Sequence, residues 1–301
     1  MTQFPQFPQF PQSPPAAPPV AFVMPIQGEK IICDNTNYYI GAYVGKGAFG
    51  TVYECTDDWG NRLVAKVLAP INKPYWMVRD EWNKELSNLQ ILRHPNITYI
   101  HKAFEYRNVF YIVMEKCELT LEQFMNYPDF NGEHWLPFIA RDLLHALDFI
   151  HNQNYVHKDL HAGNIFVSNQ FDPIFRDKEP VWSFKVGDLG ITNLVGFIRP
   201  NTILAQWMLA PEVLNQQFGN VGKQMDIYHV GLLLLRMITK VHYDFSHQDI
   251  VNGVPRQIAE NLESPYSSAI ANSLRRNVFY RTQSAISMWR EIQNLVPKNY
   301  S

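Results

Sequence analysis

The segment His157–Asn164, HKDLHAGN, decides how this chain of 301 residues is best understood. It gathers two histidines, a lysine, a carboxylate and a carboxamide, and the apolar run IFV follows directly at 165–167. Two further short motifs lie downstream, GDLG at 187–190 and APE at 210–212. Each motif is weak evidence by itself, so their order along the chain, together with the residues before them, carries the interpretation.

Upstream of this segment, three glycines lie between two predicted strands. Residues 44–53, VGKGAFGTVY, place glycine at 45, 47 and 50. Without β-carbons, a backbone can approach phosphate oxygens and donate its N–H groups to them. A strand is predicted after this loop and Gly-Lys-Ser/Thr is absent, which excludes a dinucleotide-binding fingerprint and a Walker phosphate loop. A simple hairpin turn is the alternative.

Lys66 lies within VAKV at 64–67, on the next predicted strand. A lysine flanked by apolar residues can hold nucleotide phosphates if an acidic partner keeps it charged and in place. The following predicted helix offers Glu85 and, one turn earlier on the same face, Glu81. The alternative is a lysine at a strand edge whose ammonium group reaches solvent.

Composition limits the classes of partner. Hydrophobic residues make up 46% of the chain and the formal net charge is −2, which favours a folded core and argues against nucleic acid as a partner. The three cysteines, Cys33, Cys55 and Cys117, are too few and too scattered for a disulfide framework or a zinc site. No secretory signal or 18-residue apolar stretch is present, so we expect no membrane partner and a cytoplasmic location.

Hydrophobic periodicity predicts an α+β fold with a small five-stranded lobe, one main helix in that lobe, and a larger, mostly helical lobe. The strands of the first lobe are predicted at residues 38–44, 51–56, 62–68, 97–104 and 109–114, with the helix at 76–92. The helices of the second lobe are predicted at 121–126, 134–152, 210–215, 224–239, 256–261, 266–275 and 282–294, with short strands at 165–168 and 184–186.

The N-terminal 25 residues differ from the rest. Gln-Phe-Pro repeats in tandem from residue 3 to residue 11 and further prolines follow, which favours polyproline II over helix or sheet. We expect a disordered tail at 1–25 and a linker at 26–37. Docking of the tail to a proline-recognition partner is the alternative to a merely flexible segment.

With these motifs in this order, the chain resembles the eukaryotic-type protein kinase family over about residues 38–296. The resemblance implies a two-lobed protein kinase domain at 38–301, with an N-lobe at about 38–114, a hinge at 115–119 and a C-lobe at about 120–296. It also implies ATP and Mg²⁺ as cofactors and a protein as substrate. The HPN sequence at 94–96 follows Glu85 at the spacing typical of the family, which selects Glu85 over Glu81.

The resemblance implies a role for each matching residue. Asp159 is the residue that accepts or orients the proton of the substrate hydroxyl, and Asn164 and Asp188 hold Mg²⁺. Lys66, paired with Glu85, positions the nucleotide phosphates. The remaining nucleotide-binding residues implied are the loop Val44, Gly45, Lys46, Gly47, Ala48, Phe49 and Gly50, the adenine-sandwiching Val52, Ala65 and Phe166, and Met114, Glu115 and Cys117 at the hinge.

The resemblance also implies two structural anchors. Asp226 matches the start of a buried helix of the C-lobe, and Arg281 matches the arginine that pairs with Glu212 of the APE motif. Without Arg281, Glu212 would be left buried and unpaired, so we expect this pair to stabilise the fold.

Several positions depart from the family pattern. Lys158 replaces an arginine that binds activation-loop phosphate through two nitrogens, which lysine cannot do. His161 stands where serine/threonine kinases carry lysine, and Leu189 replaces phenylalanine after Asp188. Residues 170–182 form an insertion that we expect to be exposed.

These observations predict an ATP-dependent protein kinase acting on serine or threonine, with a tyrosine acceptor left open. Two alternatives remain. The eroded positions favour a pseudokinase that binds nucleotide or a partner without transfer. The HxDxxxxN motif also resembles aminoglycoside and choline phosphotransferases, although these generally lack an APE motif.

Overall fold

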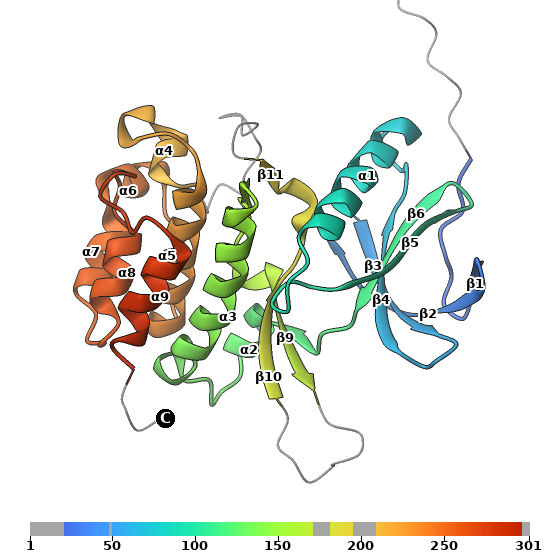
Figure 1. The fold of residues 1–301 in the computed structure, drawn as a ribbon, viewed down its shortest axis with the longest axis horizontal. Helices are drawn as coiled ribbons and strands as arrows, with labels where there is room; N and C mark the ends of the chain where they lie inside the picture. Colours follow the sequence, from blue (N-terminus) through green and yellow to red (C-terminus); the bar gives the residue numbers. More distant parts are fainter. Residues whose placement is uncertain (1–20, 48–49, 171–180, 195–208, 297–301) are drawn as a thin grey trace, which may run out of the picture.

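The computed structural model describes residues 21–47, 50–170, 181–194 and 209–296. Strands form one lobe and helices the other, with the connecting chain between them (Figure 1). The two-lobed α+β architecture expected from the sequence is therefore confirmed. The predicted tail falls mostly on residues 1–20 and the predicted insertion mostly on 171–180, and both of those ranges lie outside the described residues.

The smaller lobe is built on an antiparallel sheet of six strands in the order β1-β2-β3-β4-β6-β5. Its strands are β1 (Lys30–Cys33), β2 (Thr36–Gly47), β3 (Gly50–Asp57), β4 (Arg62–Leu68), β5 (Ile100–Tyr106) and β6 (Val109–Glu115). The prediction of five strands was wrong, because β1 lies in the stretch interpreted as a linker. Pairing of Ile31 with Tyr38 of β2 buries Ile31 completely, which stabilises a strand too short to be recognised alone.

Helix α1 (Tyr75–Ile91) connects the sheet with the other lobe. Its Trp82 packs on Phe110 with ring centroids 5.3 Å apart and donates a hydrogen bond to the Tyr111 carbonyl at 3.1 Å. On its buried face, Asn88 Nδ2 donates to the carbonyls of Leu189 and Thr192 at 2.9 and 3.0 Å. The position of α1 therefore depends on both lobes.

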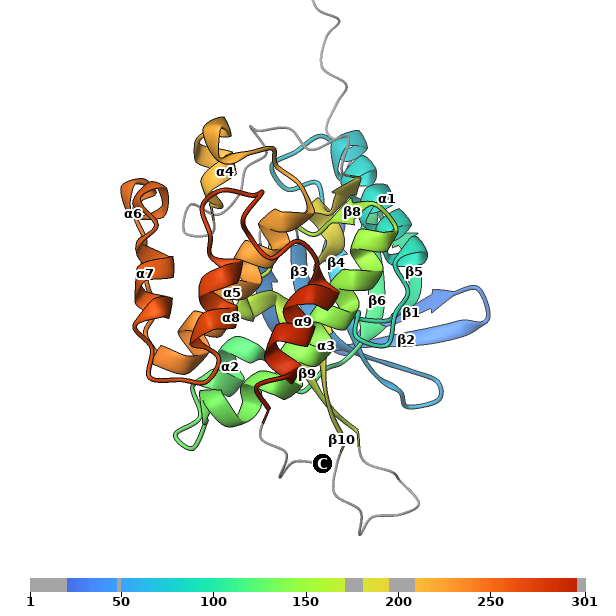
Figure 2. The ribbon, with the colours of Figure 1, turned by 60° about the vertical axis from the view of Figure 1, so that its left-hand side comes forward.

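Within the described residues, the larger lobe contains every helix predicted for it and one further α-helix, α6. Its helices are α2 (Leu121–Met125), α3 (Gly132–Asn152), α4 (Pro211–Leu214), α5 (Lys223–Thr239), α6 (His247–Asn252), α7 (Val254–Glu260), α8 (Ser267–Ser273) and α9 (Ala285–Gln293). Its short strands are β7 (Leu119–Thr120), β8 (Tyr155–Val156), β9 (Ile165–Gln170), β10 (Val181–Val186) and β11 (Asn193–Leu194). Helix α3 lies alongside α9 (Figure 2).

Helix α5 forms the centre of this lobe. Apolar side chains cover almost its whole circumference, and most of its residues are buried, as expected for a helix enclosed by other elements. Helix α3 packs against it. The N-cap residue of α3 is Asn131, whose side chain accepts a hydrogen bond from the His134 N–H at 3.2 Å. The segment His157–Asn164 follows β8, and none of its residues is fully exposed.

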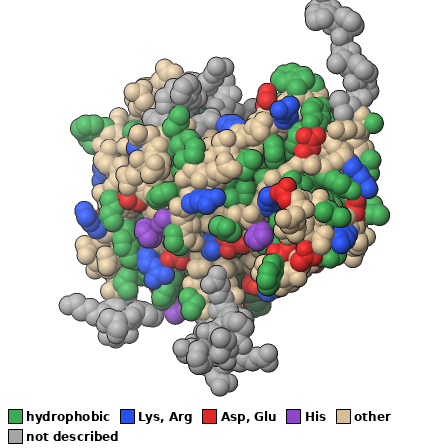
Figure 3. Space-filling view, turned by 45° about the vertical axis from the view of Figure 1, so that its right-hand side comes forward, with side chains coloured by type: hydrophobic (Ala, Val, Ile, Leu, Met, Phe, Trp, Pro, Cys, Tyr) green, Lys and Arg blue, Asp and Glu red, His purple; other side chains and the backbone are tan. Residues whose placement is uncertain are grey.

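The surface shows no field of one sign on the face drawn in Figure 3, where basic and acidic side chains are interspersed. Within the described residues, no helix is long and apolar enough to cross a bilayer.

The pairing of Glu212 with Arg281 is confirmed as a fully buried ion pair. Two hydrogen bonds of 2.7 and 2.8 Å join the guanidinium to the carboxylate, and neither side chain is exposed. The remaining donors of Arg281 reach the carbonyls of Arg275, Gln224 and Arg276, and its guanidinium lies 4.9 Å from the Tyr228 ring centroid. Good geometry and complete hydrogen bonding are what make a buried pair tolerable.

Arg281→Ala should lower the free energy of unfolding by about 3–5 kcal/mol, because Glu212 would be left charged and unpaired in the core. Chemical denaturation would measure the change, with the exposed Arg290→Ala as the matched control on the neighbouring helix. Equal stabilities of the two variants would contradict the role assigned to this pair.

Candidate active site

A cavity of about 400 Å³ lies between the two lobes. It is lined at one end by charged and amide side chains and at the other mainly by apolar ones. The sequence-predicted residues that line it are Val44, Gly47, Gly50, Val52, Lys66, Glu85, Met114, Glu115, Cys117, Asn164, Phe166 and Asp188. The fold therefore brings together motifs that are far apart in the sequence.

Lys66 lies at the charged end between two carboxylates. Its Nζ is 2.7 Å from Glu85 Oε1 and 3.1 Å from Asp188 Oδ1, and its side chain is 9% exposed. Burial opposes the charge of Lys66, yet the two carboxylates outweigh it and raise the pKa of the ammonium group. Burial also raises the pKa of Glu85, against the opposing effect of Lys66. Glu81 instead pairs with Lys73 on the surface.

Asp188 occupies a left-handed backbone conformation, with φ of 54°. This conformation is uncommon outside glycine and is tolerated best by Asp and Asn. Burial disfavours the ionised carboxylate, but the contact with Lys66 lowers its pKa overall. Asp188 is therefore held as an anion facing the cavity.

Asp159 and Asn164 lie close together on the loop after β8. Asn164 Nδ2 donates to the Asp159 carbonyl at 2.9 Å and to Asp159 Oδ2 at 3.0 Å. Because the amide nitrogen is engaged in this way, the Oδ1 atom of Asn164 is the one that can face a cation. The carboxylate of Asp159 is thereby oriented by its own loop.

His161 lies beside the same carboxylate. Its Nδ1 accepts a hydrogen bond from the Gly163 N–H at 3.1 Å, and its Nε2 is 3.8 Å from Asp159 Oδ1. Burial lowers the pKa of His161, against the attraction of Asp159, so the ring is favoured in its neutral form. Acceptance at Nδ1 then places the proton on Nε2, on the side of Asp159.

The loop as a whole is fixed by Asp226 of α5. Its Oδ2 accepts hydrogen bonds from the His157 N–H at 2.8 Å and from His151 Nε2 at 2.9 Å, while its Oδ1 accepts one from the Lys158 N–H at 2.8 Å. Burial raises the cost of the charge, but the hydrogen bond from His151 and the electrostatic attraction of the histidines at 151, 157 and 229 lower the pKa of Asp226 below its usual value.

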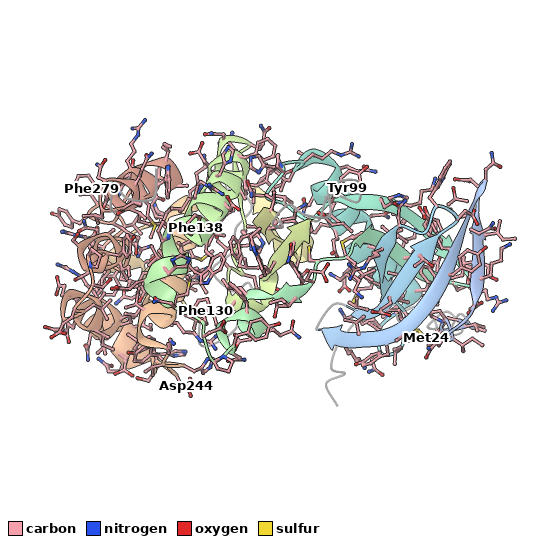
Figure 4. All side chains as sticks on the ribbon, turned by 90° about the horizontal axis from the view of Figure 1, so that it is seen from below. Met24, Tyr99, Phe130, Phe138, Asp244 and Phe279 are labelled. Atoms are coloured by element: carbon pink, nitrogen blue, oxygen red, sulfur yellow. The ribbon has the colours of Figure 1, made fainter. Side chains whose placement is uncertain are left out.

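The connection between the lobes closes the apolar end of the cavity. Glu115 accepts two hydrogen bonds from Lys185 Nζ at 2.7 and 2.8 Å, and a third from the Tyr99 N–H at 2.7 Å. Tyr99 lies on the sheet lobe (Figure 4) and Lys185 on β10, so the side chain of Glu115 joins both lobes. Burial raises the pKa of Cys117 to about 12, which keeps its thiol protonated.

The structure does not place Ala65 in the cavity; Val64 lines it instead. Side chains of a strand alternate between its two faces, so Val64 and Lys66 share the cavity face. Ala65 points to the opposite face and belongs to the other core cluster, together with Leu63 and Val67. The sequence analysis assigned Ala65, which is adjacent to Lys66. Because residues two positions apart on a strand share a face, strand alternation would have selected Val64 instead.

The glycine loop is described only in part. Gly47 and Gly50 line the cavity, Lys46 lines a neighbouring hollow, and Ala48 and Phe49 lie outside the described residues. Gly45 does not line the cavity. At Gly50 a β-carbon would lie 2.7 Å from the Val67 carbonyl oxygen, and φ is +154°, so only glycine fits there.

The residues present fit a nucleotide and Mg²⁺. The apolar end, between Val52 and Phe166, suits a flat ring, and Lys66 at the other end suits phosphate. The Asp188 carboxylate and the Asn164 amide oxygen are the oxygen donors that Mg²⁺ prefers, with phosphate completing the coordination.

Lys158 departs from this pattern of partnered charges. It is 1% exposed, and among the residues that the structure describes its Nζ has no hydrogen-bond partner. Burial, reinforced by repulsion from Lys84, lowers the pKa of Lys158 to about 8. The buried ammonium group therefore destabilises the folded state at neutral pH.

Comparison with known proteins agrees with this geometry. The family model for the protein kinase domain matches residues 38–297. The probable serine/threonine-protein kinase zyg-1 of Caenorhabditis briggsae is 29% identical over 202 residues, covering 65% of this chain and 26% of that relative. Serine/threonine-protein kinase PLK2 of Rattus norvegicus is 28% identical over 220 residues, covering 70% and 30%. Mitogen-activated protein kinase 9 of Arabidopsis thaliana is 28% identical over 219 residues, covering 68% and 40%. The chain thus spans well under half the length of these relatives.

Lys158→Met should stabilise the fold by about 1–2 kcal/mol at pH 7, because it removes an unpartnered buried cation of similar length. The folded-state pKa of about 8 lies below the ordinary 10.5, so the unfolded chain binds more protons between these values. The free energy of unfolding of the wild type should therefore increase relative to that of the variant between about pH 8 and pH 10.5.

Denaturation of both proteins across this pH range would measure the effect, with Lys73→Met as an exposed control. A stability difference that is zero at pH 7, or that does not shrink with rising pH, would contradict the prediction.

Proposed function

The chain belongs to the protein kinase family, and we propose that it transfers the γ-phosphate of ATP to serine or threonine hydroxyls of proteins. The observation that carries the proposal is the contact of Lys66 Nζ with both Glu85 and Asp188, in the cavity that Asn164 also lines. This arrangement pairs a fixed cation for phosphate with an anionic metal ligand, as phosphoryl transfer requires.

Each part of the cavity would hold a different part of the nucleotide. Val52, Val64 and Phe166 would enclose the adenine, and the backbone of the connection at Glu115 and Cys117 would meet its polar edge. Lys66 would hold the α- and β-phosphates, under the backbone of Gly47 and Gly50.

Mg²⁺, when bound at Asp188 and Asn164, would neutralise charge on the phosphates during transfer. The chain's own contribution is positional. Lys66 keeps the Asp188 carboxylate ionised, and the hydrogen bonds of Asn164 to Asp159 link the metal site to the residue that receives the substrate. Because Asp226 fixes the loop backbone, this geometry would exist before the substrate binds.

Asp159 would orient the attacking hydroxyl and accept its proton. Its carboxylate is held by Asn164 and neighbours the Nε2–H of His161, a donor that can reach a transferring phosphoryl group without carrying a full charge. The acceptor is proposed as serine or threonine because relatives such as PLK2 are named as serine/threonine-protein kinases.

A nucleotide-binding protein without transfer activity is the second candidate. It is favoured by the neutral ring of His161 and the unpartnered Lys158, where family members carry stronger cations. Transfer of labelled γ-phosphate to protein acceptors, with aminoglycosides and choline as parallel acceptors, separates the alternatives.

Asp159→Ala should reduce phosphate transfer to protein acceptors by at least about 100-fold, because the substrate hydroxyl loses its proton acceptor. The melting temperature should stay close to that of the wild type, since the Asp226 contacts remain. Labelled γ-phosphate from Mg-ATP, followed by phosphoamino-acid analysis, gives the rate and the acceptor type. Wild-type rates in the variant would remove Asp159 from the mechanism.

Lys66→Met should likewise reduce transfer by at least about 100-fold, through lost phosphate positioning. It should also leave Glu85 and Asp188 facing each other without a cation, so the melting temperature should fall. The exposed Lys73→Met serves as the control for charge removal alone. Transfer at the wild-type rate in Lys66→Met would contradict the nucleotide site.

A further inference from the structure

A hollow of about 510 Å³ lies on the helical lobe and has no described lining residue in common with the nucleotide cavity. Three segments line it, namely the first half of α3, the connection between α7 and α8, and α9 with the residues after it. Helices α3 and α9 lie side by side (Figure 2). The apolar lining residues include Pro137 and Phe138 of α3, Pro265, Trp289 and Val296.

Aromatic rings are concentrated on this part of α3. His134 and Phe138 lie one helical turn apart with ring centroids separated by 5.8 Å, and the Trp135 ring lies 5.9 Å from that of Phe138. Trp289 of α9 lines the same hollow. Phe138 and Trp289 are only partly buried, so both rings retain surface that another molecule can cover. Grooves lined by aromatic rings bind proline-rich segments, because a polyproline II helix is already extended and loses little entropy on binding.

The charges around the hollow do not select a charged ligand. Arg141 lines it, but its Nε and Nη2 both lie 2.9 Å from Asp142 Oδ1, so its positive charge is already paired. Glu133 is the acidic residue among the described lining residues, and it is exposed to water. Asn131 and Gln293 add amide groups that can form hydrogen bonds with a peptide backbone. An uncharged segment rich in rings and carbonyl groups therefore suits the hollow best.

The chain itself contains a segment of this kind. Residues 1–28 include no Asp, Glu, Lys, Arg or His, and Gln-Phe-Pro occurs three times within residues 3–11. Each repeat supplies an aromatic ring, a proline and an amide side chain. A polyproline II helix has three residues per turn, so in that conformation Phe4, Phe7 and Phe10 fall on one side, about 9 Å apart.

The place where this segment joins the fold decides which copy of the hollow it can reach. Ala21 is held at the turn between β5 and β6, where its carbonyl accepts a hydrogen bond from Asn108 Nδ2 at 2.6 Å. That turn lies in the sheet lobe, toward the opposite end of the long axis from α9 (Figure 1). A domain of this size measures roughly 50 Å across. Residues 12–20 span only about 30 Å when fully extended, so a fully seated repeat, residues 3–11, favours the hollow of another molecule.

We propose that this hollow binds the Gln-Phe-Pro repeat, residues 3–11, of a second copy of the chain. Two molecules can exchange their repeats reciprocally, or each can bind the next in a row, because the hollow and the repeat are different surfaces of one molecule. Three equivalent repeats raise the chance that one is seated, which strengthens an individually weak contact. The inference requires no phosphate transfer and goes beyond the proposed function.

The test measures the mass of the full chain over a range of protein concentrations by analytical ultracentrifugation, without nucleotide. The wild type should associate as the concentration rises. Replacing three phenylalanines together, by Phe4→Ser, Phe7→Ser and Phe10→Ser, should weaken association by at least about 10-fold, because aromatic anchors carry much of the binding energy of such contacts. This triple variant leaves every described residue unchanged, so its melting temperature should equal that of the wild type.

Phe138→Gln tests the other side of the contact and should weaken association by a similar factor. Phe279→Gln is the matched control, since Phe279 is 79% exposed on the same lobe (Figure 4) and does not line the hollow. Mixing the triple variant with Phe138→Gln should restore part of the association, because an intact hollow and an intact repeat are then present in different molecules. If Phe138→Gln melts early, Trp289→Gln takes its place.

A synthetic peptide of residues 1–20 gives an independent measurement. It should bind the full chain, compete with self-association, and bind Phe138→Gln at least about 10-fold more weakly. A wild type that stays monomeric overturns the inference even where the peptide binds, because the repeat would then be seated within its own molecule.

Association that is unchanged in the triple variant, or in both Phe138→Gln and Trp289→Gln, also overturns the inference. Failure of the peptide to bind the full chain, as expected if residues 297–301 cover the hollow, overturns it as well. None of these measurements uses phosphate transfer, so the proposed function stands or falls separately.

Discussion

The rest of the structure depends on the carboxylate of Asp226, which has no exposed surface and holds the catalytic loop on α5. Its two oxygens accept the backbone N–H groups of His157 and Lys158 and the ring of His151. Lys158 has a left-handed backbone with φ of 74°, a conformation that persists only where its surroundings impose it. Because most residues of α5 are buried, this loop is held on an enclosed helix, and the position of Asp159 follows from that attachment.

The sequence was sufficient to predict most of the fold and the charged end of the site. Lys66, Glu85, Asn164 and Asp188 were recognised because each stands in a short motif whose order along the chain is informative, and the structure brings all four to one cavity. The two lobes followed from periodicity, since strands and helices bury their apolar residues at different intervals. Sequence motifs and hydrophobic periodicity are local properties of the chain, so both can be recognised before the fold is known.

Features that depend on pairing between distant segments could not be predicted. Strand β1 exists because β2 completes it, and nothing in residues 30–33 alone reveals this. A cavity lined by Leu160 of the loop at 157–164 and by Leu232 of α5 likewise arises only when these distant segments pack together. Two differences between the prediction and the structure, at Ala65 and at α6, could have been avoided from the sequence alone. Strand alternation would have selected Val64 over Ala65, and the capping box of Ser246 and Asp249 marks the start of α6.

Two lysines of this chain show that burial alone does not determine the direction in which the pKa of a side chain shifts. Lys66 and Lys158 are both buried, at 7% and 1% exposure, yet their pKa values shift in opposite directions. Glu85 and Asp188 contact Lys66 and more than offset the cost of its burial. Among the described residues, no acceptor forms a hydrogen bond with Lys158, and Lys84 repels it. An arginine at 158 would stay charged under these conditions, but a lysine need not. The loop at 157–164 therefore carries a lysine whose pKa is lowered to about 8, whereas the lysine in the cavity between the lobes has a raised pKa.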